Sequence, residues 1–176
     1  MEAPLQLERW LDQFIIGHQI CPFAQRPRQR GIVRLQVVES SKEELFTQAL
    51  LQELLLLSEQ PAAQLSTTLL AAPNLFADFE DFHTYVEWTQ ELLVDAGLEG
   101  IVQIIGFHPN YYFADADPHD LANYTNRSPF PILHLLREEE IEWAATTHPN
   151  IESIPKRNIA YLRRLDRQTL EQLTGQ

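Results

Sequence analysis

Hydrophobic residues recur at helical spacing over the first stretch of the chain. Pro4 suits a first helical turn, and the pattern predicts a helix through about Gln19. The apolar residues that share its face are Leu7, Trp10, Leu11, Phe14 and Ile15. Because Pro22 lacks an amide hydrogen, it ends this helix or starts a separate short turn. A basic loop is expected to follow over residues 26–31.

Three apolar segments predict strands, and two longer segments between them predict helices. Apolar positions alternate or run continuously over 32–39, 66–71 and 100–107. Helical spacing over 41–59 and 76–96 predicts two amphipathic helices. A strand, helix, strand, helix, strand order predicts parallel pairing with right-handed crossovers. Because the third strand is apolar on both sides, we expect it in the centre of the sheet.

Short sequence signals set the expected ends of these helices. Ser41 followed by Glu44 predicts a capping box at the start of the first helix, and Pro61 closes it. Gly97 is the expected stop of the second helix. After Phe107 the chain is expected to be irregular until about residue 131, apart from a short helix begun by Pro118.

The segment 131–137 is ambiguous between helix and strand. Pro131, followed by Leu, Arg and Glu residues, favours a helix to about Thr146, and the alternative is an edge strand. Further helices are expected from Ser153 toward Leu165 and after Asp166. The predicted fold is therefore α/β: a small, mostly parallel sheet of three to four strands covered by helices, with a helical C-terminal part. We expect one domain over 1–176.

Composition narrows the cellular setting. The chain of 176 residues has one cysteine, so no intramolecular disulfide can form, and a reducing, cytoplasmic location is expected. The sequence shows neither a signal peptide pattern nor an apolar run of membrane-spanning length. The formal net charge of −12 argues against a nucleic-acid-binding surface and against adsorption to anionic membranes.

Basic residues nevertheless gather in two places, near the front and near the end of the chain. They are Arg26, Arg28, Arg30 and Arg34, and Lys156, Arg157, Arg163, Arg164 and Arg167. Two local basic clusters on an acidic protein suit a small anion, and the alternative is ordinary surface and helix-end charge.

Cys21 is the first candidate for chemistry. If Pro22 starts a new helical turn, Cys21 caps it, and unpaired amides together with Arg26 one turn away would lower the pKa of the thiol. Cys21 would then be a nucleophile or an anion-contacting group. The alternative is a small buried hydrophobic residue, which is the usual environment of a free cysteine.

His108 is the second candidate, because it directly follows a predicted strand. Ligands of open α/β sheets bind beyond the carboxyl ends of the strands, where a histidine can act as base, acid or ligand. The alternative is a loop histidine that caps backbone groups.

The third candidate segment is Asn126-Arg127-Ser128, which precedes two prolines and an apolar run. The guanidinium group of Arg127 can donate two parallel hydrogen bonds to a carboxylate or phosphate, and Ser128 adds a hydroxyl. The alternative is a rigid loop in which Arg127 pairs with an acid. His134 lies within one expected turn and would face the same crevice, or would be a structural histidine.

A metal site would combine Cys21, His108 and His134, but their spacing matches no tight zinc pattern. No metal is therefore predicted, and the cofactor is unknown because the sequence has no phosphate loop or nucleotide fingerprint. Cys21 and His108 are the predicted catalytic residues. The predicted substrate contacts are Arg127, Asn126, Ser128, His134 and Arg26.

Several long motifs in the chain match one known family. They are Trp10, Ile16-Gly17-His18-Gln19-Ile20-Cys21-Pro22-Phe23-Ala24, Phe107-His108-Pro109, Asn123-Tyr124-Thr125-Asn126-Arg127-Ser128-Pro129-Phe130-Pro131, Leu133-His134-Leu135-Leu136-Arg137-Glu138 and Arg157-Asn158-Ile159. In these segments the chain resembles the uncharacterised bacterial family catalogued as domain of unknown function 1415. The resemblance implies a stand-alone cytosolic bacterial protein and assigns no role to any residue.

Three functional hypotheses follow. In the first, the protein is an enzyme or sensor for a small anionic metabolite, and Cys21, His108 and the 126–128 segment line one pocket, in a monomer or homodimer. The second is a non-catalytic interaction module that docks a partner on an aromatic patch of Tyr111, Tyr112 and Phe113. The third is the metal-binding protein.

Overall fold

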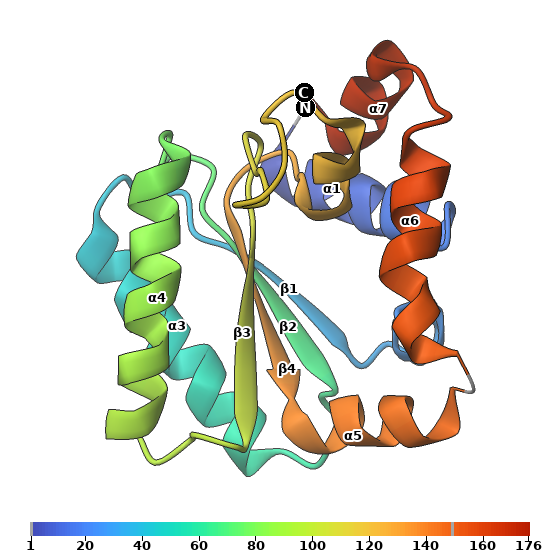
Figure 1. Cartoon of the computed structure of the whole chain (residues 1–176). Helices are drawn as coiled ribbons and strands as arrows, with labels where there is room; N and C mark the ends of the chain where they lie inside the picture. The colour runs from blue at the N-terminus through green and yellow to red at the C-terminus, as the bar shows by residue number, and fades with distance from the viewer. Residues whose placement is uncertain (1, 149) are drawn as a thin grey trace.

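The computed structural model of the chain describes residues 2–148 and 150–176 and contains a mixed sheet between two layers of helices (Figure 1). Its strands are β1 (Val33–Val37), β2 (Thr67–Ala71), β3 (Val102–Phe107) and β4 (Ile132–Arg137). They lie in the order β1-β2-β4-β3. β1 and β2 pair in parallel, whereas β4 is antiparallel to both of its neighbours. The fold class is therefore α/β, as predicted, and β1, β2 and β3 share one direction.

The helix predicted from Pro131 to about Thr146 is wrong in its first part, since Ile132–Arg137 form β4, and a helix (Glu138–Thr147) begins only after that strand. The alternative of an edge strand is also wrong, because β4 hydrogen-bonds on both sides, to β2 and to β3. Its side chains alternate between two covered faces, so the segment is almost continuously apolar. An apolar run of this length has no periodicity that separates a buried strand from a helical turn.

The insertion of β4 also moves β3 away from its predicted place. β3 was expected in the centre of the sheet, but it is the edge strand beyond β4. Gln103 is exposed in this strand, while its neighbours Val102 and Ile104 are buried. The helix α4 covers one face of β3, and this contact explains the apolar residues on that side.

Two long helices, α3 (Glu43–Glu59) and α4 (Phe79–Asp95), cover one face of the sheet. The predicted capping box does not form: the N-cap of α3 is Lys42, whose amide donates to Ser40 Oγ at 3.1 Å. α4 begins three residues later than predicted, where the Asp78 carboxylate accepts from the amides of Glu80 and Asp81. An aspartate in this position satisfies amides that have no partner within the helix.

The remaining helices lie on the other face or around its rim. They are α1 (Ala3–Arg9), the π-helix η1 (Trp10–Ile16), α2 (Gln25–Gln29), the 3₁₀ segments η2 (Leu121–Asn126) and η3 (Ile151–Ser153), α5 (Glu138–Thr147), α6 (Ile154–Leu162) and α7 (Arg167–Thr174). A second core cluster joins α1, η1, η2, α6 and α7 to the sheet. Among the described residues, no helix has the length and apolarity needed to cross a membrane.

Gly106 allows α4 to approach β3 closely. A Cβ atom at this position would lie 3.0 Å from side-chain atoms of both Phe82 and Val86. We therefore expect Gly106→Ala to lower the free energy of unfolding by about 1–3 kcal/mol, because a packed core tolerates added volume poorly. Urea unfolding measures this change. Gln103→Ala, an exposed change on the same strand, is the control, and equal effects of the two variants would contradict the packing argument.

Candidate functional site

The segment from Gly17 to Ala24, which we call the Cys21 turn, leaves η1 through a tight backbone path. A Cβ atom on Gly17 would lie 2.4 Å from the carbonyl oxygen of Gln13, so only glycine fits there without a shift. Gln19 has a φ of 54°, a left-handed conformation that is costly for a residue with a side chain. The amides of Ile20 and Cys21 both donate to the carbonyl of Ile15. The sequence-based expectation of one continuous α-helix to Gln19 missed this path.

α6 holds the Cys21 turn through three polar contacts. Arg157 Nη2 donates to the carbonyl oxygen of Gln19, the residue with positive φ. The buried amide of Asn158 donates to the carbonyl oxygen of Ile20 at 2.7 Å. His18 Nδ1 and the Tyr161 hydroxyl lie 2.5 Å apart. α6 therefore fixes the backbone immediately before Cys21.

The thiol of Cys21 is half-buried in this turn. Burial raises its pKa above the ordinary value, against the opposing effects of the Phe23 and Ala24 backbone amides and the positive charge of Arg157. The predicted lowering of the thiol pKa is thus wrong in direction, because desolvation outweighs the charge and the amides. α2 begins only at Gln25, so Cys21 does not cap it, and the predicted contact residue Arg26 is exposed on α2.

A hollow of about 470 Å³ lies at the start of α6, and we call it the α6 hollow. Its described lining residues are Ala145, His148, Asn150, Ile151, Glu152, Ser153 and Lys156. Phe23 of the Cys21 turn packs edge-on against His148, with 5.4 Å between the ring centroids. Lys156 lines the hollow, and the next residue, Arg157, contacts the Cys21 turn. The hollow and the turn therefore adjoin each other across His148 and α6.

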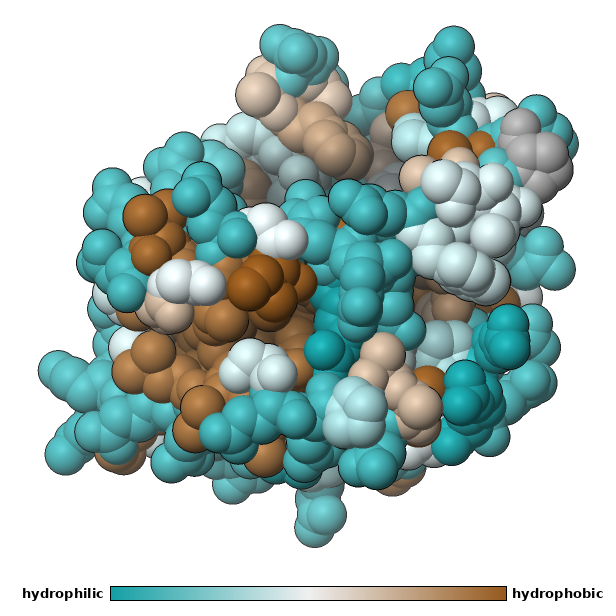
Figure 2. Space-filling view, turned by 90° about the horizontal axis from the view of Figure 1, so that it is seen from below, coloured by the Kyte–Doolittle hydropathy of each residue, from teal (hydrophilic) through white to brown (hydrophobic). Residues whose placement is uncertain are grey.

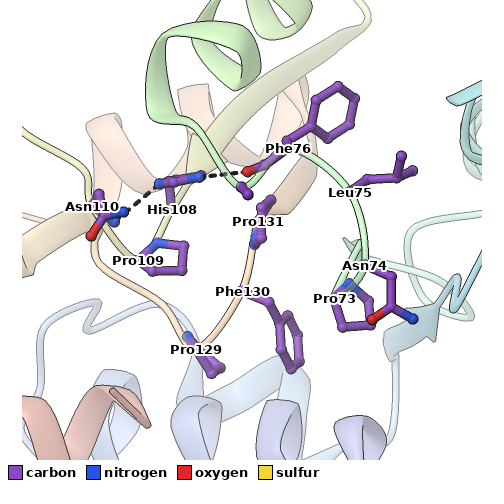
Figure 3. A pocket seen from close by; sticks show the side chains of 11 residues that line it. Pro73, Asn74, Leu75, Phe76, His108, Pro109, Asn110, Pro129, Phe130 and Pro131 are labelled. Atoms are coloured by element: carbon purple, nitrogen blue, oxygen red, sulfur yellow. Dashed lines mark hydrogen bonds between the residues drawn. The ribbon is translucent and has the colours of Figure 1, made fainter. Parts of the chain in front are cut away.

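A second hollow, also of about 470 Å³, is lined by segments that follow the carboxyl ends of β2 and β3; Figure 3 shows its lining residues. We call it the proline hollow; its lining residues are Pro73, Asn74, Leu75, Phe76, Ala77, His108, Pro109, Asn110, Pro129, Phe130 and Pro131. His108 has both ring nitrogens engaged there. Its Nε2 donates to the Phe76 carbonyl at 2.8 Å, and its Nδ1 accepts from the Asn110 amide at 3.0 Å.

These contacts place His108 in the backbone-capping role that was its alternative reading. The side chain is 1% exposed, and burial lowers its pKa, so the ring is neutral near pH 7. Phe76 has a φ of 54°, and its carbonyl accepts the His108 proton. None of the residues that line the proline hollow is a lysine or arginine, so the hollow has no charged group for an anion.

The 126–128 segment also serves its own loop. The Arg127 guanidinium donates to the carbonyls of Tyr111 and Pro118, and it lies 4.5 Å above the centre of the Tyr124 ring. Ser128 is buried and donates to the carbonyl of Phe130, while the Asn126 carbonyl accepts from the His108 amide. The segment is thus joined to His108 through the backbone, and the guanidinium of Arg127 is directed to the 111–118 loop.

His134 lies in the middle of β4 on the face of the sheet that α1 and η1 cover. It pairs with Leu69 on β2 and Ile105 on β3, and its ring lies 6.2 Å from the Phe107 ring. Burial lowers the pKa of His134 to about 4. The ring is therefore neutral near pH 7, and it is tied to the sheet rather than to the 126–128 segment.

The structure brings together only part of the predicted shared pocket. His108 and the prolines that follow Ser128 line the proline hollow, but Cys21 and Arg127 are not among its lining residues. Among residues 2–148 and 150–176, no three His, Cys, Asp or Glu side chains lie close enough together to hold a metal ion, so no such group supports the Cys21, His108 and His134 alternative.

The predicted aromatic patch packs against the protein. The Phe79 ring lies 5.2 Å from the Tyr111 ring and 5.0 Å from the Tyr112 ring, and Tyr111 also contacts Phe113. All three predicted patch residues are half-buried. The ring contacts of Tyr111 and Tyr112 with Phe79 hold the loop against α4.

Sequence reasoning missed Lys156, Arg157 and Asn158 as site residues. Arg157 and Asn158 stand in one of the motifs that indicated the family, and Lys156 belongs to the second basic cluster, so both signals were present. The link to Cys21 comes from hydrogen bonds of Arg157 and Asn158 to Gln19 and Ile20, residues 138 positions earlier in the chain. No local pattern reports a contact of that separation.

The fold and the Cys21 turn define a small α/β protein in which an antiparallel strand separates two parallel neighbours. The family model described as "Protein of unknown function (DUF1415)" matches residues 2–172, and the chain belongs to this family. No curated protein and no solved structure matches the chain.

The thiol of Cys21 provides a direct test of the site geometry. Because burial raises its pKa, we expect the native thiol to react with iodoacetamide at pH 7.5 at least about tenfold more slowly than in the urea-unfolded chain. Mass spectrometry of quenched samples measures both rates. A native rate equal to or above the unfolded rate would show an activated thiol and would contradict the raised pKa.

His134 predicts a dependence of stability on acid. Its pKa is about 4 in the folded protein and about 6.5 in an unfolded chain, so the unfolded state binds the extra proton. The contribution of His134 to the free energy of unfolding is complete above pH 6.5 and is lost as the pH falls toward 4. The loss amounts to about 2–3 kcal/mol at pH 4.5. We expect His134→Leu to flatten the urea-unfolding free energy between pH 7 and 4.5. His83→Gln, a change at an exposed histidine, is the control, and an unchanged slope in His134→Leu would contradict the assignment.

Proposed function

We propose that this protein is a cytoplasmic enzyme or sensor that binds a small anionic metabolite between the Cys21 turn and the α6 hollow, as a monomer or homodimer. The observation that carries the proposal is the contact of Arg157 and Asn158 with the two carbonyls before Cys21. This contact keeps the thiol, a guanidinium and the α6 hollow next to one another.

The charges on this side of the molecule support an anion. Lys156 lines the α6 hollow, and Arg157 is exposed and donates through one nitrogen, Nη2, to the Gln19 carbonyl and to the Asn158 side chain. Because Arg157 is exposed, its guanidinium group is accessible to a phosphate or carboxylate. Glu152 is the one carboxylate among the described lining residues, and it favours a ligand that also carries a donor.

The size and chemistry of the hollow support a small metabolite. A volume of about 470 Å³ falls within the usual range for small-molecule sites. Ser153 and Asn150 add uncharged polar groups, and His148 adds a ring that Phe23 orients. Cys21, with its raised pKa, would contact the ligand as a neutral thiol rather than as a thiolate.

The proline hollow is a weaker place for the same ligand. It lacks a lysine or arginine, and its histidine is neutral and engaged with the backbone. An anion there would lose its hydration with no opposite charge in return. Lys156 and Arg157, rather than the predicted Arg127, would therefore bind the anion.

A stability screen tests the proposal. Thermal unfolding is recorded with inorganic phosphate and with a set of phosphorylated and carboxylated metabolites. A ligand at 100 times its dissociation constant should add about 2.7 kcal/mol. We expect Lys156→Ala to abolish this ligand-dependent shift while leaving the melting temperature of the ligand-free protein nearly unchanged, because the side chain is exposed.

Arg164→Ala removes the same charge from another exposed position of the chain and is the matched control. It should keep the ligand-dependent shift. If no anion stabilises the protein, or if Arg164→Ala abolishes the shift as completely as Lys156→Ala, the proposed site is wrong.

A further inference from the structure

Several large apolar side chains on α3, on α4 and in the turn before β3 are exposed to solvent. The set comprises Leu51 (43% exposed), Leu55 (56%), Trp88 (39%), Val94 (54%) and Ile101 (50%), which we call the α3–α4 surface. Figure 2 shows apolar residues gathered on the lower face of the molecule, on the side that these helices occupy in Figure 1. Large apolar groups in such number exceed the scattered exposure that is normal for a surface.

The seam between the two helices runs through this surface. The hydroxyls of Thr47 on α3 and Tyr85 on α4 lie 2.8 Å apart and join the helices. One turn farther along, α3 carries Leu51 and α4 carries Trp88, whose ring lies 5.3 Å from that of Tyr85. Since both helices connect strands of one direction, they run side by side, and the seam continues toward Leu55.

The apolar strip is continuous with the core beneath it. Leu56, Leu92 and Leu98 are partly buried, and they pack against the core cluster of α3, α4 and the sheet. The strip is thus the outer edge of a packed layer rather than a set of isolated side chains. Two helices that run in the same direction with apolar side chains along their seam provide a groove for a third helix.

The polar residues around the strip have one sign of charge. Between Lys42 and Arg127 the sequence contains no lysine or arginine. The exposed charged residues of α3 and α4 are Glu43, Glu44, Glu59, Glu80, Asp81, Glu87, Glu91 and Asp95. The exposed charged side chains that α3 and α4 themselves carry are therefore carboxylates, and this acidic rim favours a cationic partner; the nearest cations in the sequence are Lys42 before α3 and Arg34, which pairs with Glu53.

We propose that the α3–α4 surface docks an amphipathic helix of another protein, with an apolar stripe flanked by lysine or arginine residues. The apolar stripe would cover the seam, and its cations would meet the acidic rim. A second copy of this chain would bring two acidic rims together, with a net charge of −12 on each molecule. Two acidic rims brought into contact repel each other, so the observations favour a basic partner over self-association.

A designed peptide tests the docking surface. The probe is an 18-residue helical peptide of leucine and lysine with its leucines on one face, and the reference is a peptide of the same composition whose leucines are scattered. We expect the full-length protein to bind the first peptide at least about tenfold more tightly in fluorescence anisotropy. We also expect added salt to weaken the binding.

Variants separate this surface from general attraction between opposite charges. The double variant Leu51→Ser, Leu55→Ser should weaken binding about tenfold, whereas Leu5→Ser, at an exposed leucine of α1, should leave it unchanged. Circular dichroism confirms that each variant is folded. Glu87→Gln with Glu91→Gln should reduce the dependence on salt.

Three results would overturn the proposal. The first is equal binding of the two peptides, which would show attraction by charge alone. The second is an equal loss of binding in Leu5→Ser and in the double variant. The third is a dimer in analytical ultracentrifugation that Leu51→Ser with Leu55→Ser dissociates, since a second copy would then cover the strip.

Discussion

The backbone that carries Cys21 depends on α6 for its hydrogen bonds. The turn after η1 leaves the carbonyls of Gln19 and Ile20 outside any helix or strand, and Gln19 holds a strained left-handed conformation. Arg157 and Asn158 satisfy both carbonyls. Without Asn158, the buried carbonyl of Ile20 would lie unpaired beside a packed core, and without Arg157 the exposed carbonyl of Gln19 would be left to water. The position of the thiol, the orientation of Phe23 and the neighbourhood of the α6 hollow all follow from this contact.

A similar device occurs at the other hollow. Phe76 is the second non-glycine residue with positive φ among the described residues, and His108 donates to its carbonyl. In both places a side chain distant in sequence holds a strained carbonyl in place. The difference is charge: a cation performs this role at the Cys21 turn, and a neutral ring performs it at the proline hollow. This difference is why the anion-binding proposal rests on the first place.

The sequence predicted what local periodicity encodes. The helices α3 and α4 were recognisable from their amphipathic spacing, β1 from its alternation, and β2 and β3 as short apolar runs between helices. β4 was not, since it is covered on both sides and its apolar run resembles a helical turn. Cys21 was selected for its thiol, but the pKa of that thiol depends on burial, which only the assembled fold reveals. His108 and Arg127 were selected for their chemistry, whereas their partners are backbone carbonyls of the loops that surround them.

The most direct test of the account is an NMR titration of the uniformly ¹⁵N-labelled protein with the anion that stabilises it most, or with inorganic phosphate. Amide shifts report the place of binding without a variant. The account predicts saturable shifts in two segments, 18–24 and 150–158, with little change elsewhere. Shifts confined to 73–77, 108–110 and 129–131 would assign the ligand to the proline hollow instead, and they would contradict the role given to Lys156 and Arg157.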